Sequence, residues 1–139
     1  MGIEQLSSQI HSVHSTISYL NQDVHQKREQ LERLIQCNQQ LLTLHEDLFS
    51  ILPSIRRPEL HSQNWVGSNA QEFEDLRETS IVNQFHQLLN YQYSNLEQAL
   101  EVKITEIKNE LNSLESRIYS QQTRLSQLES RRKEMLTYE

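Results

Sequence analysis

Apolar residues recur with a period of seven along residues 3–52, in two interleaved series that begin at Ile3 and Leu6. Twelve of the fifteen positions in these series are aliphatic. A heptad seam of this length is typical of one uninterrupted helix packed against another helix. The sequence therefore predicts a first helix over about residues 3–52.

The helix-breaking residues of the chain interior fall together directly after this helix. Pro53, Pro58 and Gly67 are the internal prolines and glycine, and a proline ring excludes the hydrogen bond of the preceding helical turn. We therefore expect the first helix to end at Pro53 and a loop to occupy residues 53–67.

A second helix is predicted from about residue 69 to about residue 136. Ser68 and Gln71 have the spacing of a capping box at its start, and no proline or glycine interrupts the sequence after them. The far half carries a regular apolar seam, whereas the near half is wider and less regular. Two long helices joined by one loop pack as antiparallel neighbours. The expected fold is all-α: a long, coiled-coil-like antiparallel two-helix hairpin that forms a single domain over residues 1–139.

The seam of the second helix is longer than the first helix can cover in the simplest register. If Leu52 and Asn69 flank the turn, Ile3 lies opposite Ile118, and residues beyond about 120 lack an intramolecular partner. The apolar seam nevertheless continues, and an exposed apolar stripe costs about 25 cal/mol per Å². This overhang predicts contact with another chain, unless the last turns fray or the loop shifts the register. The predicted partner-binding residues are Leu125, Leu128 and Met135.

A second apolar stripe flanks the seam of the first helix. Ile35, Leu42 and Phe49 are seven residues apart, and a contact between two helices needs only one narrow seam. We therefore include these three residues among the predicted partner-binding residues. The alternative, that they pack beneath the loop and around Trp65, is equally consistent with the sequence.

Three kinds of polar residue fall on or beside the seam. The simplest register sets Asn38 opposite Asn83, and a buried asparagine pair can fix the register of a coiled coil. His45 occupies a seam position, where we expect a hydrogen-bonded core histidine. Cys37 lies beside the seam, where an inert buried thiol is expected rather than a nucleophile.

Composition and charge exclude several classes of protein. Hydrophobic residues make up 35% of the chain, and two glycines and two prolines are too few for the turns of a sandwich or barrel. The formal net charge of −6 disfavours nucleic acid and anionic membranes as partners. The single cysteine allows no internal disulfide. No stretch has the length of a membrane-spanning helix, and the N-terminus does not resemble a secretory signal peptide.

The sequence offers no arrangement of residues suited to catalysis. His11 and His14 share one helical face, but no third metal ligand accompanies them. Neither a glycine-rich phosphate loop nor a catalytic triad spacing is present. We therefore expect no enzyme activity, no cofactor and no metal site.

The break between the two helices carries a short motif. Trp65 and Gly67 form a W-x-G turn, and the spacing continues into the second helix with Ala70 and Phe73. This arrangement resembles the WXG superfamily of small helical hairpins associated with type VII secretion. The length of the chain, its long helices and its Glu-, Gln- and Ser-rich final helix most resemble the YwqH-like small proteins encoded beside LXG-domain toxins.

The resemblance implies a non-enzymatic, chaperone-like targeting protein. Such a protein would bind the helical N-terminal domain of an LXG toxin, with or without a second small helical partner, and support its export by type VII secretion. The chain departs from secreted members of the superfamily in one respect, because no Tyr-x-x-x-Asp/Glu motif follows the second helix. The expected location is the cytoplasm, or outside the cell together with the partner. The alternative function is a self-associating coiled-coil scaffold or tether, for which a homodimer is expected.

Overall fold

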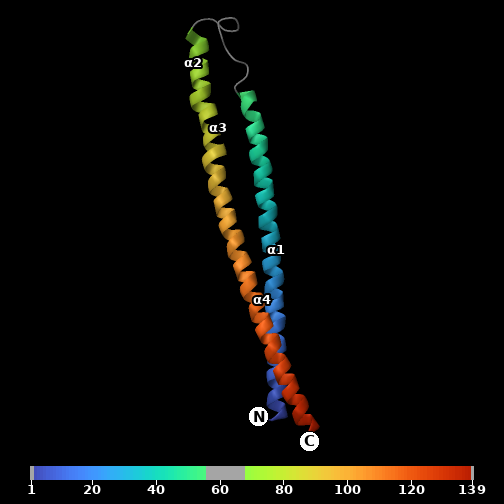
Figure 1. Cartoon of the computed structure of the whole chain (residues 1–139). Coiled ribbons are helices and arrows are strands. Elements are labelled where there is room, and N and C mark those ends of the chain that lie inside the picture. The colour runs from blue at the N-terminus through green and yellow to red at the C-terminus, as the bar shows by residue number, and fades with distance from the viewer. Residues whose placement is uncertain (1, 56–67, 139) are drawn as a thin grey trace. The chain divides into compact units, whose positions relative to one another are not determined.

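The computed structural model describes residues 2–55 and 68–138, and within them every regular element is a helix. The first is α1, Ile3–Ile55. A second helical run follows, made of five elements without interruption (Figure 1). The predicted all-α class is confirmed for these residues. The elements of the second run are α2 (Ser68–Leu76), the π-helical segment η1 (Arg77–Val82), α3 (Asn83–Gln87), the π-helical segment η2 (Leu88–Gln92) and α4 (Tyr93–Thr137).

The helix ends agree with the predicted ends to within three residues. Helix α1 begins at Ile3 as predicted but continues to Ile55, so that Pro53 lies inside its last turn. Proline has no N–H to donate, so Pro53 removes one helical hydrogen bond, and the helix ends two residues later. The second run begins at Ser68, where the Gln71 amide donates to the Asp75 carboxylate one turn ahead, at 3.2 Å.

The contacts of the chain gather into two compact units, each built from both helical runs. Unit 1 comprises Met1–Arg33 and Ile104–Glu139, and unit 2 comprises Leu34–Lys103. In each unit a stretch of α1 lies beside a stretch of the second run that has the opposite direction (Figure 1). The antiparallel hairpin pairing is thus present in both units, whereas a single domain over the whole chain stays a prediction.

The core of unit 1 is formed by leucine, isoleucine and valine side chains from α1 and α4. Leu6, Ile10 and Val13 of α1 enclose Leu128 of α4, whose exposed fraction is 8%. Partly buried hydrophobic residues surround this cluster: Ile17, Leu125 and Met135.

Ion pairs border the same helix pair. Lys27 Nζ lies 2.7 Å from Glu110 Oε2, and an Arg28 guanidinium nitrogen lies 3.1 Å from Glu115 Oε1. The hydrogen bond from Lys27 to Glu110 raises the pKa of the lysine. Exposed pairs of this kind contribute about 0–1 kcal/mol each, so they align the helices more than they stabilise them.

The predicted register between the helices is wrong. That register sets Ile3 opposite Ile118 and leaves the seam beyond residue 120 without a partner in the chain. In the structure the end of α4 packs on the beginning of α1, and Leu128 is buried there. The overhang argument therefore fails, because Leu128 lies in the core of unit 1 and Leu125 and Met135 pack against it partly buried. A partner-binding role for these residues stays a prediction.

The cause of the error is visible in unit 2. His45 of α1 contacts Leu89 of the second run. From this contact α1 continues for ten residues to Ile55, whereas the second run extends back for twenty-one residues to Ser68. The two helix ends therefore do not flank the turn symmetrically. A connection of a dozen residues can span up to about 40 Å, so connection length alone does not fix the offset.

The corrected register also removes the predicted asparagine pair. Asn83 is exposed, and the contact of His45 with Leu89 shows that α1 faces a later part of the second run. Asn38, which is only half-buried, therefore has no buried Asn83 opposite it. The register of unit 2 is set by other contacts.

Replacement of Leu128 tests its placement in the core. Leu128→Ala should lower the free energy of unfolding of the isolated chain by about 2–5 kcal/mol, because it leaves a cavity between α1 and α4. Leu136→Ala truncates an exposed leucine of the same helix and should change it by less than about 0.5 kcal/mol. Urea titration followed by circular dichroism measures both. Equal midpoints for the two variants would show that Leu128 has no partner within the chain.

Candidate functional site

Two π-helical segments interrupt the second run within unit 2, and they account for its irregular apolar pattern. In η1 the Asn83 amide donates to the Glu78 carbonyl, and in η2 the Tyr93 amide donates to the Leu88 carbonyl. Each bond spans five residues instead of four. A π turn holds one extra residue, so it shifts the residues that follow around the helix axis. The buried positions therefore depart from heptad spacing here.

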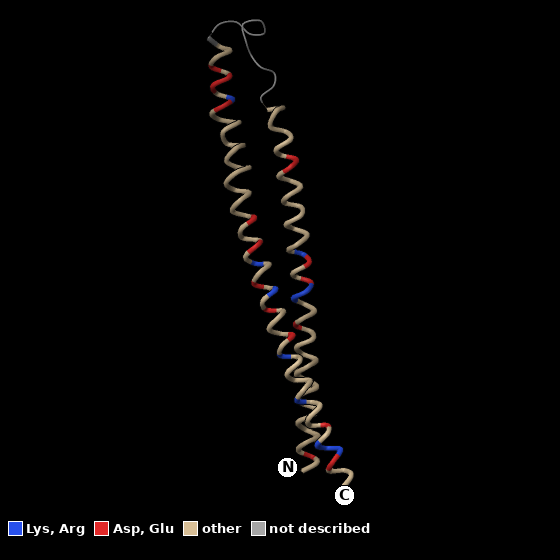
Figure 2. Tube along the Cα trace, viewed as in Figure 1, with Lys and Arg blue, Asp and Glu red and all other residues tan. Residues whose placement is uncertain are grey.

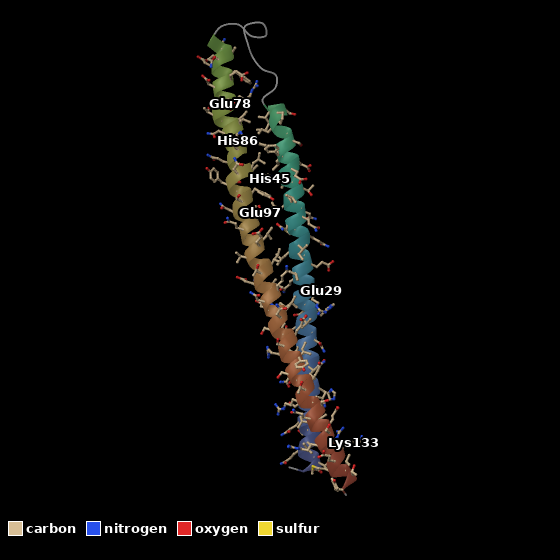
Figure 3. All side chains as sticks on the ribbon, in the orientation of Figure 1. Glu29, His45, Glu78, His86, Glu97 and Lys133 are labelled. Carbon is tan, nitrogen blue, oxygen red and sulfur yellow. The ribbon has the colours of Figure 1, made fainter. Side chains whose placement is uncertain are left out.

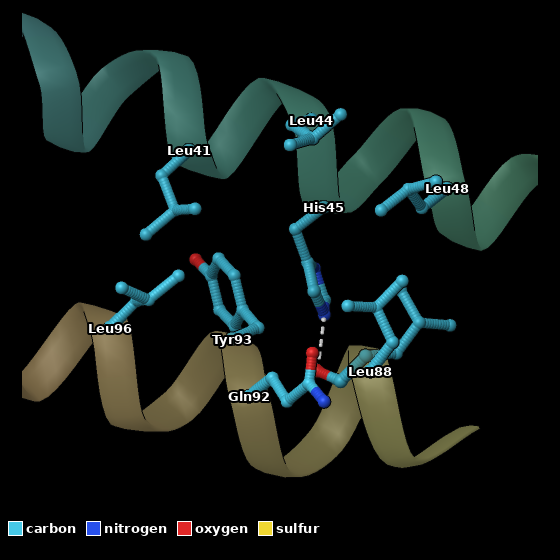
Figure 4. A pocket seen from close by; sticks show the side chains of 9 residues that line it. Leu41, Leu44, His45, Leu48, Leu88, Gln92, Tyr93 and Leu96 are labelled. Atoms are coloured by element: carbon cyan, nitrogen blue, oxygen red, sulfur yellow. Dashed lines mark hydrogen bonds between the residues drawn. The ribbon is translucent and has the colours of Figure 1, made fainter. Parts of the chain in front are cut away.

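The second π turn leaves a backbone carbonyl available, and His45 uses it. In an α-helix the Tyr93 amide would donate to Leu89, but here it donates to Leu88. His45 Nε2 lies 3.2 Å from the Leu89 carbonyl oxygen (Figure 4). Because a carbonyl only accepts, Nε2 must carry the proton. The His45 and Tyr93 rings also stack at 3.9 Å with an interplanar angle of 30°. The expected hydrogen bond of His45 is confirmed, with the Leu89 carbonyl of the π turn as acceptor, but the histidine is only partly buried and not a core residue.

An apolar groove lies between the two helices around this contact, with a cavity of about 90 Å³ (Figure 4). We call it the unit 2 groove. On its α1 side Leu44 remains 53% exposed, and on the opposite side Leu96 remains 55% exposed. Leucine side chains thus remain accessible where the two helices meet. The groove is lined by Leu41, Leu44, His45 and Leu48 of α1 and by Leu88, Leu89, Gln92, Tyr93 and Leu96 of the second run.

Tyr93, which lines the groove, is influenced by the charges of nearby acidic residues. Figure 3 shows His45 and Glu97 on the two facing helices of unit 2. Burial raises the pKa of the Tyr93 hydroxyl, and the charges of Glu97, Glu46 and Glu101 raise it further. A side-chain interaction with Glu97 acts on the pKa in the same direction. The Tyr93 hydroxyl therefore keeps its proton to higher pH than a free tyrosine does, and the charges that act on it belong to acidic residues of both helices.

The predicted second stripe of α1 is on the surface. Ile35, Leu42 and Phe49 are all exposed, and Phe49 reaches 62%. Large exposed apolar residues gather in unit 2 beyond this stripe, including several that the heptad pattern did not single out. Leu44 is the clearest of these, because the run Leu41-Leu42-x-Leu44 holds more leucines than one seam can bury. The further members are Ile51, Phe73, Leu76, Ile81, Leu88, Tyr91, Leu96 and Val102.

The W-x-G motif is described only in part. Trp65 and Gly67 lie outside the described residues. Ala70 is buried, whereas Phe73 is exposed and lies under the Arg77 guanidinium at 5.1 Å from the ring centroid. Arg77 is 6% exposed and pairs with Glu74 at 3.6 Å. No sequence signal marked this buried arginine, which occupies a position where the helical period predicts an apolar residue.

The remaining reactive side chains form no recognisable centre in the described residues. Cys37 is exposed, which corrects the expectation of a buried thiol. His14 Nε2 lies 3.7 Å from Glu129 Oε1, and the described chain holds no group of three or more His, Cys, Asp or Glu that could bind a metal ion. Among the described helices, none combines the length and apolar character needed to cross a membrane.

Comparison of the chain with protein-family models, curated proteins and solved structures finds no match. The resemblance to the WXG superfamily and its YwqH-like members therefore stays a prediction. The surface of unit 2 supplies the observations on which function can be argued.

The contact between His45 and the π turn can be tested by truncation. His45→Ala should lower the free energy of unfolding by about 1–3 kcal/mol, because it leaves the Leu89 carbonyl without its donor in a partly buried site. Amide hydrogen exchange should also become faster along η2. His25→Ala, which removes an exposed histidine paired with Glu29, is the control. A His45 variant no less stable than the control would contradict the structural role.

The raised pKa values predict a loss of stability in alkaline solution. In the unfolded chain Tyr93 loses its proton near its ordinary pKa of 10, whereas in the folded chain its pKa is higher. The folded state then binds more protons, so the free energy of unfolding should fall as the pH rises above about 10. Lys27 contributes in the same direction. Tyr93→Phe should make the free energy of unfolding fall less steeply with pH. In an alkaline titration of the folded chain, it should also remove the tyrosinate absorbance that appears at the highest pH. An unchanged slope would show that Tyr93 is not responsible.

Proposed function

We propose that this chain is a non-enzymatic partner protein that binds a helical domain of another protein. On the resemblance of its W-x-G turn, that domain is the helical N-terminal domain of an LXG toxin, and the chain supports its export by type VII secretion as a targeting or chaperone-like factor. A second small helical protein in the same complex is consistent with this function.

The exposed apolar surface of unit 2 is the observation that carries the proposal. Soluble monomers rarely expose contiguous apolar patches beyond a few hundred Å², and larger ones mark interaction sites. Unit 2 exposes Ile35, Leu42 and Phe49 on one flank of α1 and Leu44 on the other. Helices with apolar residues on both flanks of a seam can pack against a third helix.

The distribution of charge disfavours the alternative of a self-associating scaffold that pairs through this surface. The described residues of unit 2 carry eight Asp or Glu and two Lys or Arg, which gives a formal charge of −6. A symmetric dimer brings the same surface of both copies together. Two surfaces of the same sign repel each other at low ionic strength. A different chain as partner avoids this repulsion.

The proposal is tested with the purified chain and the purified N-terminal domain of an LXG toxin from the same genome. Light scattering after size-exclusion chromatography should show a complex of defined stoichiometry. Leu42→Asp combined with Phe49→Asp should weaken binding by more than about tenfold, because charged groups replace apolar contacts in the interface.

Tyr19→Asp combined with Tyr119→Asp is the matched control, since both tyrosines are highly exposed and belong to unit 1. Circular dichroism should show that all variants remain helical. Absence of any complex with the toxin domain would refute the proposed function. A stable homodimer that does not bind this domain would favour the scaffold.

A further inference from the structure

The unit 2 groove has the form of a site for one more helix. On α1, Leu41, Leu44 and Leu48 follow one another at three- and four-residue spacing along one side. Leu88 and Leu96 face them from the second run. Rows of this spacing on two neighbouring helices leave hollows that receive the side chains of an amphipathic helix.

The groove is held by a specific contact as well as by apolar packing. Leu88 is the first residue of the π-helical segment η2, and Leu96 follows it in α4, while the Leu89 carbonyl between them accepts from His45. Because His45 and Tyr93 also stack, the spacing of the helices at this point is fixed by polar and aromatic contacts. A preorganised groove binds more tightly than one that must form on binding.

Charge distinguishes the groove from the rest of the chain. The second run has no Lys, Arg, Asp or Glu from Thr79 to Leu96 (Figure 2). The residues that line the groove include none of these four types either. Outside it, Asp47 and Leu44 line a second depression on α1, and Glu46, Glu97 and Glu101 act on the Tyr93 hydroxyl. The groove is thus an apolar strip with acidic side chains near it.

Most of the net charge of the chain lies in unit 2. In the described part of unit 1, nine acidic residues balance nine basic residues, whereas the described part of unit 2 has a charge of −6. Counted over the full sequence, residues 34–103 carry nine acidic and four basic residues, and the rest of the chain carries ten and nine, so five of the six net negative charges belong to unit 2. The electrostatic attraction for a positively charged partner is therefore directed at unit 2, where the groove lies.

We propose that the unit 2 groove binds an amphipathic helix of the partner whose apolar face is flanked by Lys and Arg. The apolar face fills the leucine-lined strip, and the basic flanks lie near Asp47, Glu46 and Glu97. A second copy that placed its own unit 2 in the groove would bring like charges together, so we assign the groove to a different protein. This inference rests on the proposed function and adds to it the chemistry of the bound segment.

Synthetic peptides of about three heptads test the groove directly. One peptide has a leucine face flanked by lysines, and the other has the same face flanked by glutamates. Fluorescence anisotropy with the full chain at low salt should show binding of the lysine peptide and about tenfold or weaker binding of the glutamate peptide. Added salt should reduce the difference, because it screens exposed charges.

Variants of the chain test whether the peptide binds in the groove. Leu44→Ser with Leu96→Ser should weaken the lysine peptide by about tenfold without loss of helicity, since both side chains are about half exposed. Tyr119→Ser, at a 73% exposed residue of unit 1, is the control and should bind as the unaltered chain does. Glu46→Gln with Glu97→Gln should weaken the lysine peptide selectively.

The outcomes separate this inference from the proposed function. Equal affinity for both peptides, no binding of the lysine peptide, or unchanged binding by the Leu44 and Leu96 variant would each overturn the groove assignment. Dimerisation of the chain through the groove, detected by light scattering and abolished by the same variant, would also overturn it. If the groove binds the basic peptide but the toxin domain does not bind the chain, the toxin assignment fails and the groove assignment stands.

Discussion

Two helices that lie side by side can cover only one narrow stripe on each other, and this limit explains the difference between the two units. In unit 1 the apolar residues are nearly confined to that stripe, and Leu6 and Leu128 are buried by the pairing. In unit 2 the chain has more leucine, isoleucine and phenylalanine than one seam can hold. The excess remains on the surface, as at Leu44 and Phe49.

The π turns show how the second run accommodates this excess. An extra residue in a turn shifts the buried series and brings Leu89 and Tyr93 toward α1, while one backbone carbonyl loses its usual donor. His45 supplies the replacement and joins the helices by a polar bond inside an apolar contact. The irregular turn thus provides the acceptor for a specific hydrogen bond between the two helices.

The helices could be predicted from the sequence, but their register could not. The heptad seam predicts the start of α1 at Ile3, as observed, and the capping-box spacing predicts a second helix from about residue 69, one residue after its observed start at Ser68. The offset between the helices depended on the geometry of the connection, which neither periodicity nor loop length determines. For that reason Leu128 was assigned to an overhang although it lies in a core. The stripe of Ile35, Leu42 and Phe49 could be predicted without knowing the register. A residue that flanks the seam of its own helix does so however the two helices are aligned.

The uncharged stretch from Thr79 to Leu96 has a consequence for the isolated chain. Charged gatekeeper residues and prolines normally interrupt apolar segments and limit aggregation. This stretch contains neither, although it includes Ile81, Val82 and Phe85. The formal charge of −6 on the described part of unit 2 opposes the approach of a second copy. Acidification or high salt would remove that protection, so the region best suited to receive another protein is also the one that most needs to be covered.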